Sequence, residues 1–140
     1  MKRKYAWILA LICAASSVVA TPGQTAPPGQ HTVTVTLNYD FTADNACTVS
    51  VTTGCLKQFN IYDLTSGTPV KLFSIAAPAG ANGAVTGITG TSALITLHSG
   101  VHTFGATAQM ADGTESDPNA CTATATVKPG APVNFTVTVQ

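Results

Sequence analysis

The chain has little charge, and the charge it has is unevenly placed. Charged residues make up 9% of its 140 residues, and its single arginine, Arg3, lies between Lys2 and Lys4. After those three residues, the rest of the chain has only three lysines and six carboxylates. Nucleic acids and anionic lipid surfaces are bound by clustered lysine and arginine side chains. We therefore expect neither nucleic acid nor a charged membrane surface among the partners of this protein.

The chain also lacks the patterns of common catalytic and metal sites. It has no C-x-x-C pair of the kind that binds zinc and no G-x-S-x-G turn for a nucleophilic serine. The acidic side chains near residue 115 lack EF-hand spacing, so they indicate a solvated turn and not a Ca²⁺ site. A catalytic trio of His102, Ser116 and Asp117 would have to converge across a loop. We therefore expect no enzyme activity, no metal ion and no cofactor.

The first twenty residues have the layout of a secretory signal peptide. A basic start, MKRK, precedes the apolar run AWILALICAA and the small-residue exit SSVVA. This layout predicts cleavage after Ala20. The apolar run is shorter than the roughly 20 residues that a membrane-spanning helix needs, so we expect no stable membrane insertion. The mature chain is expected to be secreted or held in the cell envelope, with three lysines and six carboxylates giving a net charge of −3.

Three cysteines lie beyond the expected signal peptide: Cys47, Cys55 and Cys121. An exported chain folds under oxidising conditions, so the sequence predicts one disulfide and one remaining thiol. The sequence alone leaves three pairings open.

The remaining residues have the composition and periodicity of β-structure. Residues 21–30, rich in Pro, Gly and Gln, are expected to form a flexible leader. Apolar residues and threonines alternate from Thr32 to Phe41, which is a strong strand pattern. We expect a long surface connection at 78–90 and further strands at 48–52, 56–64, 70–75, 92–97, 101–110, 121–127 and 133–139. About eight short strands without a helix predict an all-β antiparallel sandwich.

Three segments carry a family resemblance. HTVTVTLNYD and LKQFNIYD are similar to the second and third strands of fibronectin type III domains, with Tyr39 at the position of the family's core tryptophan and Phe59 at a tyrosine position. The opening of the segment GVHTFGATAQMADGTESDP is similar to the sixth strand. The matching positions there and just before it are Leu97, Gly100, Phe104, Ala106, Ala108, Asp112, Gly113, Glu115 and Ser116. The chain from His31 to Val127 thus resembles a fibronectin type III domain, which implies an immunoglobulin-like antiparallel two-sheet sandwich of seven to eight strands over residues 31–140.

The chain departs from this family in three places. The family's first strand is not evident, residues 46–54 look inserted between the second and third strands, and an extra strand follows at 133–139. We expect the extra strand to cover the sheet edge that the first strand would normally cover, because an open edge invites pairing with other chains. It is also compatible with a transthyretin-like or carboxypeptidase-regulatory-like sandwich.

The resemblance also implies a role for one histidine, whereas the family has no such cysteines and their pairing is argued only from the geometry of the proposed fold. His102 lies near the start of the sixth strand, where a tyrosine of the family bonds back to upstream backbone, so we expect His102 to form a structural corner. In this fold the insert and the loop before Cys121 lie at one pole. We expect Cys121 to pair with Cys47 or Cys55, although a Cys47–Cys55 bridge would close the insert instead.

The function that the sequence favours is that of an exported, non-enzymatic β-sandwich module. It would bind an unknown protein or surface ligand, with Asp112, Glu115 and Asp117 as a candidate contact loop. A carbohydrate-associated module is one alternative, for which Tyr62 is the best exposed aromatic. A subunit of a cell-surface assembly is another, since an open edge or a spare cysteine would allow oligomerisation.

Overall fold

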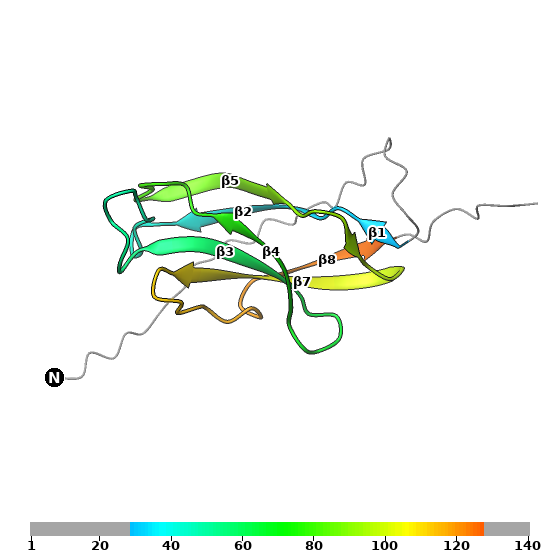
Figure 1. Ribbon diagram of the computed structural model, residues 1–140. Helices are drawn as coiled ribbons and strands as arrows, with labels where there is room; N and C mark the ends of the chain where they lie inside the picture. Colours follow the sequence, from blue (N-terminus) through cyan, green and yellow to red (C-terminus); the bar gives the residue numbers. More distant parts are fainter. Residues whose placement is uncertain (1–28, 128–140) are drawn as a thin grey trace, which may run out of the picture.

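The structure, a computed structural model shown in Figure 1, describes residues 29–127. The expected signal peptide, the leader up to residue 28 and the extra strand at 133–139 lie outside the described residues. No helix within residues 29–127 is long and apolar enough to span a membrane.

The described residues form an all-β sandwich of antiparallel sheets. A four-stranded sheet has the order β4-β3-β7-β8, and it lies against the β2-β5 pair, which a short β1-β6 pair continues (Figure 1). The strands are β1 (Gln30–His31), β2 (Thr34–Asp40), β3 (Leu56–Asp63), β4 (Val70–Ala76), β5 (Ala84–Thr91), β6 (Ile95–Thr96), β7 (Gly100–Met110) and β8 (Thr122–Val127). The predicted fold class is therefore confirmed.

The core lies between the two layers and follows the period-two pattern of the sequence. Leu37 and Tyr39 on β2 face Phe59 and Ile61 on β3, and all four side chains are at least 95% buried. The rings of Tyr39, Phe41 and Phe59 meet edge to face, with centroids 4.8–6.2 Å apart. Edge-to-face contact is the arrangement that the ring quadrupole favours. A second cluster near the start of β2 contains Val33, Leu97, Phe104 and Val127.

Two sequence-based assignments were wrong. The expected connection at 78–90 contains most of β5, whose apolar alternation is interrupted by Gly87 and Gly90. Gly87 sits at a bulge with a φ of 73°, and Gly90 gives room to Ile75, because a Cβ at Gly90 would lie 2.5 Å from Ile75 Cγ1. These glycines are therefore required by a bulge and by close packing, and they do not mark a loop.

The second wrong assignment is the strand expected at 48–52. Thr48 there forms a turn: its N–H donates to the Val51 carbonyl, and its Oγ1 accepts the Val51 N–H at 2.9 Å. A threonine that bonds to backbone two or three residues ahead competes with strand pairing. The segment is consequently a loop and not a strand.

Candidate functional site

One pole of the sandwich is organised by a disulfide between Cys47 and Cys55, whose Cα atoms are 5.0 Å apart. The expected bridge from Cys121 to one of these residues is therefore wrong, and the alternative bridge that closes the insert is the one that forms. Cys121 is buried, and it is not a free thiol either.

The position of Cys121 along the sheet explains the error. The Cys55 carbonyl accepts the N–H of Ala111, just past the end of β7, whereas the Cys121 carbonyl accepts the N–H of Ala106 in the middle of that strand. Five residues of extended strand separate the two places by about 16 Å. A disulfide needs Cα atoms within about 7 Å. The loop before Cys121 thus returns too far along the sheet for Cys121 to reach the pole.

The disulfide loop, residues 48–54, presents apolar side chains to solvent on an anchored base. Val49 is fully exposed and Val51 is half exposed. The base is fixed because Cys47 N–H donates to the Leu56 carbonyl and the Cys47 carbonyl accepts the Gly80 N–H. No residue of the loop carries a charge. The two valines are therefore displayed on a loop whose base is fixed.

The loop from residue 111 to residue 120 folds back over the outer face of the four-stranded sheet. Gly105 on β7 lies directly beneath it, since a Cβ there would lie 2.3 Å from the Pro118 carbonyl oxygen. Within the loop, Ser116 Oγ accepts the N–H of Ala108 at 3.0 Å, and Ser116 N–H donates to the Ala108 carbonyl. These bonds attach the loop to the sheet.

The three acids of the expected contact loop have different surroundings. Asp112 and Asp117 are exposed, and each accepts the N–H of a residue two positions ahead in a local turn. Glu115 instead reaches over the sheet, where its Oε1 accepts hydrogen bonds from Asn60 Nδ2 at 2.7 Å, Tyr62 O–H at 2.8 Å and Thr107 O–H. All three acids are therefore exposed, and Glu115 differs because it also anchors the loop to the sheet.

Glu115 is the centre of a wider polar network on that outer face. Gln58 Nε2 donates to Asn60 Oδ1 and to Gln109 Oε1, each at 2.8 Å. Burial raises the pKa of Glu115, but the bonds from Thr107, Asn60 and Tyr62 and the charge of Lys71 outweigh it, so the pKa lies below its usual value. Burial and the bond to Glu115 raise the pKa of Tyr62. The network ties β3, β7 and the loop together.

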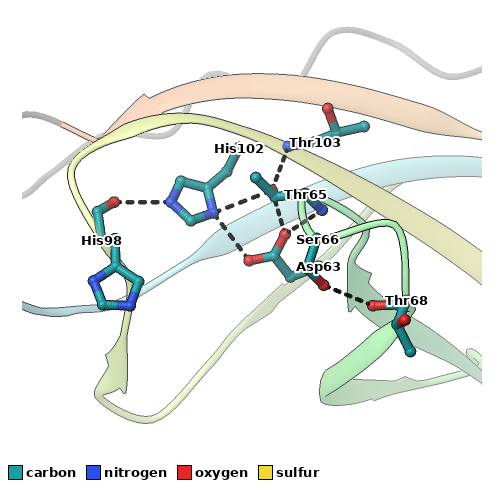
Figure 2. A network of polar contacts seen from close by, with 7 residues as sticks. All are labelled: Asp63, Thr65, Ser66, Thr68, His98, His102 and Thr103. Carbon is teal, nitrogen blue, oxygen red and sulfur yellow. Dashed lines mark hydrogen bonds and ion pairs between the residues drawn. The ribbon is translucent and has the colours of Figure 1, made fainter.

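His102 is the centre of a second polar network at the opposite pole (Figure 2). Its ring is buried, with Nδ1 2.9 Å from Asp63 Oδ2 and Nε2 2.8 Å from the carbonyl oxygen of His98. Since a carbonyl only accepts, Nε2 carries the hydrogen of that bond. The ring also stacks on Phe104, with centroids 5.9 Å apart. The bond to His98 is of the kind that the family resemblance implied, and the structural role of His102 stays a prediction tested below.

Asp63 and Thr65 complete this network. Thr65 donates from both its N–H and its O–H to Asp63 Oδ1, and Thr65 Oγ1 accepts the N–H of Thr103 at 3.0 Å (Figure 2). Burial raises the pKa of Asp63, but the two bonds from Thr65 and the contact with His102 outweigh it, so the pKa lies below its usual value. The network joins the end of β3 to the start of β7.

The structure does not bring the considered catalytic trio together. Ser116 bonds to Ala108, six residues along β7 from His102, and Asp117 bonds to Asn119 within its own turn. Within residues 29–127, no three His, Cys, Asp or Glu side chains gather in a way that would hold a metal ion.

The sequence did not predict that Val49 is exposed at the loop tip or that Glu115 anchors the second loop to the sheet. The first had a signal in the two cysteines around an uncharged insert, whereas the second depends on a tertiary fold-back that leaves no local pattern.

Comparisons with models of protein families, with curated proteins and with solved structures find no match to this chain.

Proposed function

We propose that this protein is an exported, non-enzymatic binding module that contacts a protein or surface ligand through its disulfide loop. The observation that carries this proposal is the full exposure of Val49 at the tip of a loop whose base is closed by Cys47–Cys55. A loop held in one conformation loses little conformational entropy on binding. A disulfide of this kind also supports an extracytoplasmic location, where thiols are oxidised.

The arrangement of the strands supports a fibronectin type III-like assignment. An order of β4-β3-β7-β8 opposite β2-β5 is what the resemblance implies for such a sandwich. Modules of this architecture carry their binding residues on loops at one end of a rigid scaffold. The disulfide loop occupies such an end, between β2 and β3.

The test compares two exposed valines on the same scaffold. A fluorescent label on the exported chain measures its binding to intact cells of the source organism. We expect Val49→Asp to weaken binding by at least about tenfold, equivalent to about 1.4 kcal/mol, because a charge would enter the apolar contact. Val101→Asp is the matched control, since Val101 is 63% exposed near the start of β7, at the opposite pole. Equal binding of both variants and the parent chain would refute the proposal.

A carbohydrate-associated module is the second candidate. Tyr62 lies on the outer face of the four-stranded sheet beside the polar side chains of Gln58, Gln109 and Glu115. Sugar recognition combines an aromatic ring with polar partners of this kind. Binding to a glycan array that is lost in Tyr62→Ala but kept in Val49→Asp would favour this candidate over the disulfide loop.

A further inference from the structure

Asn82 and Gly83 form an accessible dipeptide in the segment 77–83, which connects β4 to β5. Asn82 is exposed, and a Cβ at Gly83 would meet no atom within 4 Å, so the space around the bond between them is open. Within residues 29–127, no hydrogen bond holds the side-chain amide of Asn82 or the N–H of Gly83. These two groups are therefore free to approach each other.

An asparagine followed by glycine has a reaction open to it that needs only water. The Gly83 nitrogen, once it has lost its proton, attacks Asn82 Cγ and closes a five-membered succinimide ring, and the side-chain nitrogen takes up a proton and leaves as ammonia. Water then opens the ring at Cγ, which gives aspartate, or at the backbone carbonyl carbon, which gives isoaspartate. Proximity favours an attack within one chain. Glycine has no Cβ that would shield its nitrogen.

Asn119 shows what restrains this reaction elsewhere in the described chain. It is also exposed, but its Nδ2 donates to Asp117 Oδ1 at 3.0 Å. The nitrogen that would attack it belongs to Ala120, and that N–H donates to the Asp117 carbonyl. Both reacting groups at Asn119 are thus held in a turn, whereas neither is held at Asn82.

Backbone hydrogen bonds fix the chain on each side of the Asn82–Gly83 dipeptide. The Ala81 carbonyl accepts the Ala46 N–H, and the Gly83 carbonyl accepts the Phe41 N–H, each at 2.9 Å. Ala46 and Phe41 are both buried. Isoaspartate would insert one methylene, about 1.5 Å of additional bond, into the backbone between these two carbonyls. The insertion displaces one carbonyl relative to the other and so strains both hydrogen bonds.

We propose that Asn82 is a site of spontaneous deamidation, and that the isoaspartate formed there loosens the bonds of Phe41 and Ala46. This inference does not depend on the proposed binding function. It concerns the same pole of the sandwich as the disulfide loop, because the Gly80 N–H in this segment donates to the Cys47 carbonyl.

The first test follows the conversion in the full exported chain, stored in a mildly alkaline buffer and sampled by peptide mass spectrometry. We expect Asn82 to deamidate at least about tenfold faster than Asn119 in the same molecules. Gly83→Ala should slow the reaction at Asn82 by at least about tenfold, because its methyl group shields the attacking nitrogen while finding no atom within 4 Å. Equal rates at Asn82 and Asn119, or an unchanged rate in Gly83→Ala, overturn the proposal. If Gly83→Ala does not fold, the comparison within the parent chain decides.

The second test measures amide hydrogen exchange in isoaspartate-containing chains, separated from fresh chains by their added charge. We expect the N–H groups of Phe41 and Ala46 to exchange at least about tenfold faster than in the fresh chain. The Leu64 N–H, which donates to the Thr103 carbonyl near the opposite pole, should not change. Fresh Asn82→Asp is the matched control, since it adds the charge without the methylene and should exchange like the parent chain. Equal exchange in aged and fresh chains overturns the proposal, as does exchange in Asn82→Asp that is as fast as in the aged chain.

Discussion

At the scale of single residues, His102 is expected to contribute to stability through its polar network. Replacing it with Ala removes the donor to the His98 carbonyl and the contact of Nδ1 with Asp63 Oδ2, in a site where His102 is 6% exposed. Loss of such bonds costs about 2–4 kcal/mol. We expect His102→Ala to lower the free energy of unfolding in urea by this amount while leaving the disulfide loop, at the opposite pole, able to bind.

His98→Ala is the control for this prediction. The His98 side chain is exposed and only its carbonyl takes part in the network, so the variant should stay within about 0.5 kcal/mol of the parent chain. A His102→Ala chain that melts like its parent but no longer binds would show that His102 contacts the ligand and is not a structural corner.

At the scale of elements, the fold-back of residues 111–120 depends on the absence of a side chain at Gly105. A Cβ at this position would lie 2.3 Å from the Pro118 carbonyl oxygen and 2.7 Å from Leu64 Cδ1. The backbone of the loop would have to move. We expect Gly105→Ala to destabilise the protein by about 1–3 kcal/mol, as overpacking does, and to increase proteolytic cleavage within the loop.

Gly83→Ala is the matched control, because a Cβ at Gly83 meets no atom within 4 Å and the residue has no positive φ. Its stability should be close to that of the parent chain. If both variants unfold at the same urea concentration as the parent, the loop does not rest on the sheet in solution.

The elements also show what local sequence can and cannot predict. β2, β3 and β7 were predicted closely because their inner faces carry large apolar residues at period two, such as Leu37 and Phe59. β5 was missed because Gly87 is required by a bulge and Gly90 by close contact with Ile75, which belongs to another strand. The contacts of Glu115 were missed for the same reason: Asn60 lies 55 residues away in the sequence, and only the folded sheet brings the two together.

At the scale of the whole molecule, folding lowers the pKa of four carboxyl groups. Hydrogen bonds lower the pKa of Asp40 and Asp112 in exposed turns, and the networks described above lower the pKa of Asp63 and Glu115. A carboxyl group with a lowered pKa in the folded state contributes stability above its unfolded pKa and loses it as the pH falls through the folded value. The free energy of unfolding should therefore decline in acid, from about pH 5 downward.

The variant Glu115→Gln tests this decline of the unfolding free energy in acid, which we call the acid limb. It removes one of the four lowered groups, so the decline in unfolding free energy below pH 5 should become shallower, even though the variant is less stable at neutral pH. Tyr62→Phe keeps the carboxylate and removes one of its three donors, and its acid limb should lie between those of Glu115→Gln and the parent chain. An identical slope in all three chains contradicts the assignment of Glu115 as an anchor.

Tyr39 and Tyr62, whose pKa values are raised by folding, determine how the unfolding free energy falls at high pH. We call this fall the alkaline limb. Burial, followed by the charge and the hydrogen bond of Asp44, raises the pKa of Tyr39, and the shift is larger than that of Tyr62. A group whose pKa is raised by folding contributes stability that is complete below its unfolded pKa, 10.0 for tyrosine, and is lost as the pH rises beyond it. The unfolding free energy should thus fall above about pH 10. Tyr39→Phe should flatten the alkaline limb and leave the contribution of Glu115 to the acid limb unchanged, because Tyr39 lies on β2 inside the core and Glu115 lies on the outer face of the other sheet. Urea titrations from pH 2 to pH 11 measure both limbs, and an alkaline limb that Tyr39→Phe does not change would mean that the Tyr39 hydroxyl is not held by Asp44 within the core.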